Sequence, residues 1–122
     1  MIRILLVLAG LMGAGGIAAW SAAAHLAAGT SLDVAAYMLL FHAPAIVAIA
    51  LALREGALHH LFGLMAAEGL ALGAVLFSSD LALRSLLGTQ LFRLAAPIGG
   101  VIVITGWLLL AVAALAAPRE RT

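Results

Sequence analysis

Three ionisable side chains lie inside long apolar stretches of the sequence: His25, His42 and Glu68. An ionisable residue within a membrane segment costs free energy, so each of the three is a candidate for function. Two histidines on neighbouring helices can bind the axial positions of a haem b iron, and this pair could instead adjoin a quinone or a lipid head group. A carboxyl group at depth can carry protons or solutes, contact another subunit, or lock its own bundle by hydrogen bonds.

The depths of these residues in the membrane limit which of them can contact one another or share a ligand. At about 1.5 Å of rise per residue, His25 and His42 differ in depth by about 6 Å on the helices expected below. Axial ligands must face one another across the iron, so the spacing favours helix-locking hydrogen bonds over haem ligation. Glu68 and His42 also differ by about 6 Å. A contact between these two is therefore expected to be feasible if their helices touch.

A second group of polar residues follows the third apolar stretch. Asp80 can cap a short helix that Gly88 ends, with Arg84 reaching water. Alternatively the third membrane helix is overlong and leaves the bilayer, which is the interpretation we favour. His59 and His60 would point about 100° apart on a helix, so they do not readily share one metal ion.

Catalytic motifs are absent from the sequence. It contains no G-x-S-x-G, no H-E-x-x-H and no phosphate-binding glycine loop. It has no cysteine, which excludes disulfides and thiolate metal sites. A formal net charge of +1 does not favour nucleic-acid binding. We therefore expect no enzyme activity, no metal site and no resident cofactor.

The elements that position these groups are expected to be membrane helices. The chain is 66% hydrophobic and 9% charged, whereas about 25% of the residues of a soluble domain are charged. About 20 apolar residues span a bilayer, and a helix satisfies its backbone polar groups internally. The sequence predicts an all-α integral membrane four-helix bundle. It forms a single domain, 1–122, with helices at about 4–28, 34–53, 58–79 and 91–117.

The distribution of arginine predicts the orientation. The first stretch has features of a secretory signal, with a basic residue, an apolar run and an alanine-rich end, but its length favours a membrane helix. Four spans place both termini on one side of the membrane. Four arginines fall on that side and two on the other: Arg3, Arg54, Arg119 and Arg121 against Arg84 and Arg93. This excess predicts cytoplasmic termini, and we expect a bacterial cytoplasmic (inner) membrane.

Small residues mark the expected contacts between helices. Gly69 and Gly73 form a G-x-x-x-G pair on the third helix, and Gly99 and Gly106 lie seven residues apart on the fourth. Membrane helices associate by close approach of their backbones, so these four positions are predicted to pack. Pro44 lies inside the second helix and is expected to leave one backbone carbonyl without its usual partner.

Four segments resemble a known family: WSAAAH, YMLLFHAPAI, LALGAVLFSS and APIGGVIVITGW, in this order. This order is similar to the YgdD-like family of small four-helix membrane proteins, relatives of a eukaryotic transmembrane-256 type and a domain of unknown function. The resemblance covers most of the chain and implies the fold but no activity. It implies that the following residues occupy characteristic family positions: His25, His42, Ser78, Pro97, Gly99, Gly100, Gly106 and Trp107.

The sequence also departs from that family pattern. Residues 79–82 read Ser-Asp-Leu-Ala, where the pattern continues Gly-Ser-Leu-Tyr, and Glu68 has no counterpart in it. These departures favour a specialised role, such as docking on a particular partner.

We expect an accessory or structural subunit that packs against a larger membrane protein complex, because the chain is small, its loops are short and catalytic groups are lacking. Glu68, Asp80 and Arg84 are the candidates for contact with that partner. One alternative is a quinone, lipid or haem b site near His25 and His42. Another is a proton or small-solute pathway through Glu68. Membrane lipid is an expected partner of the chain and nucleic acid is not. A Glu68 that points outward would favour an adjoining subunit.

Overall fold

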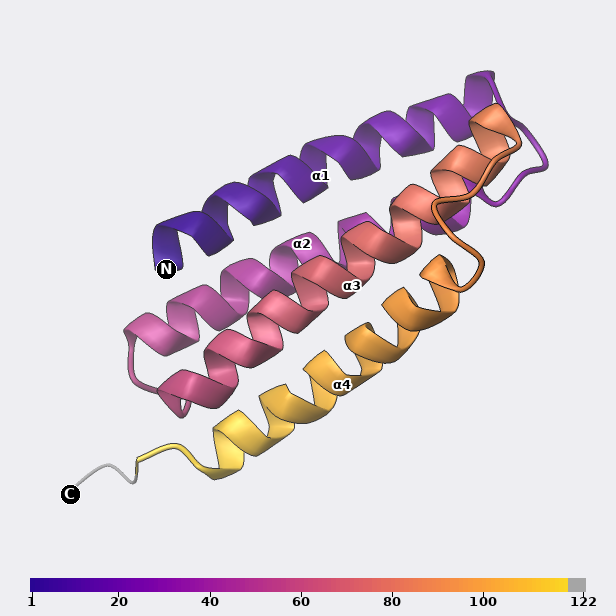
Figure 1. Ribbon diagram of the computed structural model, residues 1–122. Helices are drawn as coiled ribbons and strands as arrows, with labels where there is room; N and C mark the ends of the chain where they lie inside the picture. Colours follow the sequence, from indigo (N-terminus) through magenta and orange to yellow (C-terminus); the bar gives the residue numbers. More distant parts are fainter. Residues whose placement is uncertain (119–122) are drawn as a thin grey trace.

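The computed structural model describes residues 1–118, which form four α-helices joined by short connections (Figure 1). The helices are α1 (Ile2–His25), α2 (Leu32–Arg54), α3 (His60–Leu87) and α4 (Ala95–Leu115). Each is long and apolar enough to cross a membrane. The expected all-α four-helix membrane bundle is thereby confirmed. Arg119 and Arg121, which contributed to the predicted orientation, lie outside the described residues.

The helices pack in chain order as an open row. α1 packs on α2, α2 on α3 and α3 on α4, while α1 touches α3 only lightly. Within residues 1–118, the backbone of α4 approaches neither α1 nor α2 closely. Figure 1 shows α1 and α4 at the two edges of the row. Each helix therefore keeps a broad apolar surface, which a lipid solvent allows because it is itself apolar.

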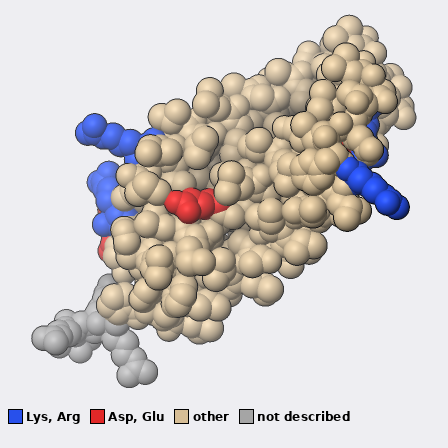
Figure 2. All heavy atoms as spheres, in the orientation of Figure 1, with Lys and Arg blue, Asp and Glu red and all other residues tan. Residues whose placement is uncertain are grey.

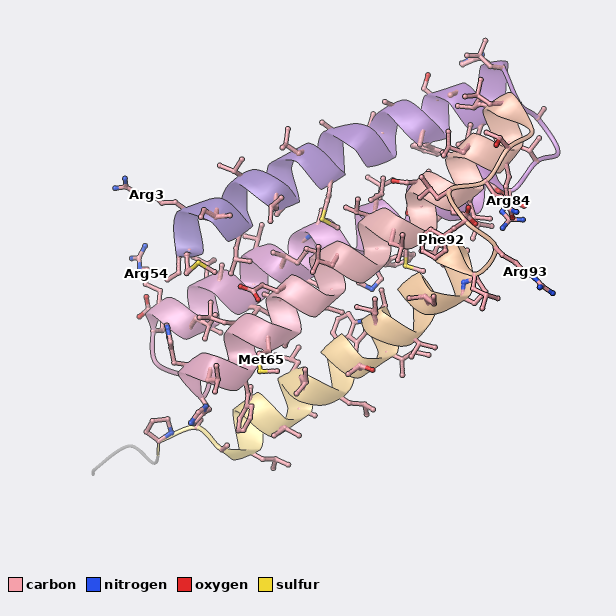
Figure 3. All side chains as sticks on the ribbon, viewed as in Figure 1. Arg3, Arg54, Met65, Arg84, Phe92 and Arg93 are labelled. Atoms are coloured by element: carbon pink, nitrogen blue, oxygen red, sulfur yellow. The ribbon has the colours of Figure 1, made fainter. Side chains whose placement is uncertain are left out.

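The arginines mark the two ends of the molecule. Arg3 and Arg54 lie at one end, named here the Arg3 end, and Arg84 and Arg93 lie at the other, the Arg84 end (Figure 3). In the space-filling view the basic side chains project from these ends, and the surface between them is almost wholly uncharged (Figure 2). This arrangement suits helices that cross hydrocarbon between two aqueous boundaries. Cytoplasmic termini stay a prediction.

Glycines set the distance between α3 and α4. A Cβ atom added to Gly73 would lie 2.7 Å from the carbonyl oxygen of Gly99, and one added to Gly99 would lie 2.7 Å from the amide nitrogen of Phe77. A Cβ on Gly69 would lie 3.6 Å from the Cα of Gly106. The two shorter distances leave no room for a methyl group, so glycine permits the close approach of these backbones.

The third helix differs from the expected range of 58–79. α3 continues without a break to Leu87, and Gly88 ends it with a φ of +65°. Asp80 therefore does not cap a separate short helix, and that prediction is wrong. With 28 residues, α3 is about 42 Å long, against about 30 Å for the hydrocarbon core. This length agrees with the favoured alternative of an overlong helix.

Two polar residues in the second half of α3, Ser78 and Asp80, are bonded to other segments. The Ser78 hydroxyl donates to the carbonyl oxygen of Ala35 in α2 at 2.9 Å. Asp80 accepts the backbone amide of Leu91, which lies beyond the end of α3. Leu91 thus belongs to the connection, and α4 begins at Ala95 rather than at about 91. Pro44 lies within α2 as expected.

Candidate functional site

Glu68 lies on the exposed face of α3. It follows His60, the first residue of the helix, by eight positions, so it lies about 12 Å along the helix axis and well inside a hydrocarbon core of about 30 Å. Spacings of three and four residues place five exposed side chains on this side of α3. We name them the Glu68 face: Leu61, Met65, Glu68, Leu72 and Val75.

Glu68 has no hydrogen-bond or ion-pair partner among residues 1–118. Figure 2 shows acidic atoms surrounded by uncharged surface between the two arginine-bearing ends. A charged side chain at the centre of a membrane helix costs about 3 kcal/mol. The contact between Glu68 and His42 that the sequence allowed does not form, because Glu68 points out of the row whereas His42 is buried.

Asp80, on the same helix, has the opposite surroundings. Its side chain is 0% exposed and its Oδ2 accepts from Arg84 Nε at 2.8 Å. Its Oδ1 accepts from the Leu91 backbone amide at 3.0 Å, which ties the connection between α3 and α4 to the side of α3. Asp80 and Arg84 were candidates for contact with a partner. In the structure they bind each other, and Glu68 is left as the unpaired member of that set within residues 1–118.

His42 joins α2 to α4, two helices whose backbones do not approach each other closely. Its Nδ1 lies 2.7 Å from the carbonyl oxygen of Met38, and its Nε2 lies 3.2 Å from Trp107 Nε1 on α4. A carbonyl oxygen only accepts and an indole N–H only donates. His42 Nδ1 therefore carries the hydrogen and donates it to Met38, while Nε2 accepts from Trp107. This contact links α2 to α4 across the groove between them.

The two histidines proposed as a ligand pair have different surroundings. His25 lies exposed in the last turn of α1, and His42 is buried with both ring nitrogens engaged. A haem iron would need the Nε2 lone pair that now accepts from Trp107. His25 and His42, as arranged, do not fit an axial haem b site. No cluster of three or more histidine, aspartate or glutamate residues suited to a metal ion occurs in residues 1–118.

Trp107 is the residue whose role was missed from the sequence, which suggested only that it packs. The hydrogen bond joins positions 65 residues apart, and no local pattern identifies such a pair. One signal was present: the resemblance suggested by the sequence implied characteristic family positions for both His42 and Trp107. Glycines 69, 73, 99 and 106 lie where α3 meets α4, as described above.

Comparison with protein families identifies a family for this chain. A family model with the description "Protein of unknown function (DUF423)" matches residues 10–100. The matched range contains most of α1, all of α2 and α3, and the first turns of α4, so it includes His42, Glu68 and Asp80 but not Trp107. Comparisons with curated proteins and with solved structures find no match.

Proposed function

Since the chain belongs to the DUF423 family of unknown function, we propose from its geometry that it is a non-catalytic accessory subunit of a larger membrane protein complex. The observation that carries this proposal is the exposed, unpaired Glu68 in the middle of the apolar Glu68 face. A lipid surface gives such a group nothing to bind. A neighbouring membrane helix can supply a donor and cover the face at the same time.

The chemistry of Glu68 restricts the partner. In the complex that we propose, Glu68 is ionised and only accepts hydrogen bonds, so the partner presents a donor at the same depth. Arg3, Arg54, Arg84 and Arg93 lie at the two ends of the helices (Figure 3). A second copy of residues 1–118 would therefore offer no cation at the depth of Glu68. The partner we propose is a different protein, with an arginine, lysine, histidine or amide side chain inside a membrane helix.

The remaining contacts of that partner would be apolar. Met65, Leu72 and Val75 are exposed on either side of Glu68, at 45%, 67% and 43%. Membrane helices associate by van der Waals packing and interhelical hydrogen bonds rather than by the hydrophobic effect. A partner helix along the Glu68 face would combine van der Waals packing on the apolar side chains with a hydrogen bond to Glu68. We further propose that the chain is a YgdD-like protein. It would lie in a bacterial cytoplasmic membrane with both termini in the cytoplasm.

The alternative functions receive less support. A proton or solute pathway needs polar groups that continue from Glu68, whereas its neighbours on the Glu68 face are apolar. A haem site at His25 and His42 needs a free nitrogen on each imidazole, and both nitrogens of His42 are engaged. A quinone oxygen would need a free N–H on His42, and the Nδ1–H of His42 already donates to Met38. We therefore retain the accessory subunit as the proposed function.

Purification of the tagged full-length chain from its native membranes in a mild detergent tests this function. We expect the wild-type chain to bring down a second membrane protein in fixed stoichiometry. Interhelical hydrogen bonds in membranes contribute about 0.6 to 1.7 kcal/mol, so Glu68→Ala should reduce retention of the partner by about threefold to twentyfold. Leu72→Ala is the matched control, since it shortens an exposed side chain of the same face without removing a polar group.

Two results would contradict the proposed function. One is a wild-type chain that runs alone, or only with copies of itself, in every mild detergent tried. The other is a partner that Glu68→Ala and Leu72→Ala retain equally well. The first result would remove the accessory role, and the second would remove Glu68 from it.

A further inference from the structure

Two hollows at the Arg84 end share the side chain of Tyr37. One, of about 340 Å³, lies between the end of α1 and the start of α2, and Trp20 and Asp33 contribute to its wall. We name it the polar hollow. The other, of about 460 Å³, lies between α2 and α4 and is named the apolar hollow. Its other lining residues are Val34, Met38, Phe41, His42 and Trp107. The two hollows adjoin at Tyr37.

The polar hollow combines a carboxylate with two aromatic rings. Asp33 is exposed at the start of α2, and its Oδ1 accepts the backbone amide of Val34 at 2.8 Å. Trp20 and Tyr37 are 52% and 46% exposed. Aromatic faces attract cations, and a carboxylate beside them adds an ion-pair partner. This grouping is suited to an ammonium group and repels an anion.

The apolar hollow lies deeper along α2 than the polar hollow and shares the side chain of Tyr37 with it. Val34, Met38 and Phe41 recur at spacings of four and three residues, so they line one side of α2. Trp107 reaches from α4 to His42 and closes the far end. From Val34 to His42 the helix rises about 12 Å, which approaches the depth of one leaflet, about 15 Å. The hollow therefore has the length and lining that part of an acyl chain requires.

We propose that these hollows form a binding site for a phospholipid with a primary ammonium head group, phosphatidylethanolamine in chemical class. The ammonium group binds Asp33 between Trp20 and Tyr37. One acyl chain follows Val34, Met38 and Phe41 down to Trp107. The apolar hollow selects a lipid over a soluble amine, because a soluble amine would leave it unfilled. This site lies apart from the Glu68 face, so it does not depend on the proposed function.

The charges at the Arg84 end decide between lipid classes. Arg84 Nε is bonded to Asp80, and neither Arg84 nor Arg93 contributes to the polar hollow. Asp33 is the charged side chain that does contribute. An anionic head group without an amine would meet this carboxylate and no cation there. Complementarity of charge therefore favours an ammonium head group over a phosphatidylglycerol.

Tryptophan fluorescence offers a direct test, since the chain has two tryptophans and they lie at the two ends of the site. In Trp20→Phe, which keeps an aromatic ring, Trp107 becomes the single reporter. The full-length variant is placed in phosphatidylcholine vesicles with rising fractions of phosphatidylethanolamine or phosphatidylglycerol, each brominated on its acyl chains. Half-maximal quenching should need about fivefold less brominated phosphatidylethanolamine than phosphatidylglycerol, as expected for a cation–π and ion-pair contact near the surface.

Two further variants in the same background identify the head-group contact. Asp33→Asn keeps an oxygen that can accept the Val34 amide but removes the charge, so it should abolish the preference for phosphatidylethanolamine while the helical circular dichroism is unchanged. Glu55→Gln removes a carboxylate at the Arg3 end, where Glu55 pairs with Arg54, and should keep the preference. Equal quenching by the two lipids, stronger quenching by phosphatidylglycerol, or a preference that survives Asp33→Asn would each overturn the proposal.

Discussion

Two carboxyl side chains of α3, Asp80 and Glu68, stand twelve residues apart in opposite surroundings. Asp80 lies toward the Arg84 end, is 0% exposed, and is bound by Arg84 and by the backbone of Leu91. Glu68 lies about 12 Å along the helix from its first residue, is exposed on an apolar face, and has no partner within residues 1–118. A carboxyl group is harder to accommodate in hydrocarbon than near its boundary, yet the one at depth is the one left unpaired.

The different bonding of Asp80 and Glu68 distinguishes a polar group that stabilises its own chain from one that is available to bind another molecule. Asp80 joins two segments of its own chain, because it ties the connection before α4 to α3. Glu68 binds no other side chain within the described residues. Its carboxyl group would stabilise the protein in the membrane only when a partner supplies a hydrogen-bond donor. Asp80 should therefore matter for stability in isolation, and Glu68 should matter for association.

The largest expected loss of stability comes from a substitution that displaces α4, the helix whose preceding connection Asp80 holds. In Gly73→Ala, the new Cβ would meet the Gly99 carbonyl oxygen at 2.7 Å and the Val103 amide nitrogen at 2.8 Å. Backbone atoms cannot move aside as a flexible side chain can, so α4 must shift. We expect the midpoint of thermal unfolding in detergent to fall by on the order of 10 °C. Gly10→Ala is the matched control, because its Cβ has nothing within 4 Å.

The next largest effect is expected for Asp80→Ala. The substitution leaves the Leu91 amide and Arg84 without their acceptor, so the connection between α3 and α4 should loosen. We expect the unfolding midpoint to fall by on the order of 5 °C, and hydrogen exchange at Leu91 to accelerate. Arg84→Ala should have a smaller effect, since Asp80 keeps its bond to Leu91. Unchanged exchange at Leu91 in Asp80→Ala would contradict this role.

A smaller effect is expected for the contact between α2 and α4. Trp107→Phe keeps an aromatic ring but removes the N–H that donates to His42. A neutral hydrogen bond contributes about 1 kcal/mol, so thermal unfolding should shift by a few degrees. Trp20→Phe makes the same change at an indole for which no hydrogen bond occurs among residues 1–118, and it should shift less. Equal shifts for the two variants would remove the stabilising role of this bond.

The smallest effect on the isolated chain is expected for Glu68→Gln. The side chain makes no bond within residues 1–118, so the free energy of unfolding in detergent should stay within about 0.5 kcal/mol of wild type. Differential scanning fluorimetry of Glu68→Gln beside Asp80→Asn measures the contrast directly. A loss of stability in Glu68→Gln as large as that in Asp80→Asn would show that the two carboxyl groups have the same role.

The architecture could be predicted from the sequence because it depends on local composition. Four apolar stretches separated by polar residues define four membrane helices, and the glycines at 69, 73, 99 and 106 lie where α3 and α4 approach. Helix ends were less predictable. Asp80 resembles a helix cap, but its carboxylate is occupied by Arg84 and Leu91, so the helix continues through it.

The surroundings of the candidate site could not be predicted, because they depend on how each helix is rotated about its axis. Gly69 and Gly73 turn one side of α3 toward α4, and Glu68 then points away from it. The sequence allowed His42 to pair with Glu68 or His25, and its partner is instead Trp107 on α4, a helix whose backbone does not approach α2 closely. Contacts between residues so distant in the chain leave no periodic signal in the sequence.

The most direct test of the central claim is photocrosslinking in native membranes from the Glu68 face. A photoreactive residue replaces Leu72 in one variant and Ile104 in another; the two side chains are 67% and 63% exposed, on α3 and α4. Gly106 packs opposite Gly69 and Leu70, so Ile104 lies at a similar depth to Leu72. We predict that the probe at 72 forms a crosslink to a second membrane protein and that Glu68→Ala lowers its yield several-fold. A crosslink shared by both positions, or one at 72 that Glu68→Ala leaves unchanged, would contradict the account.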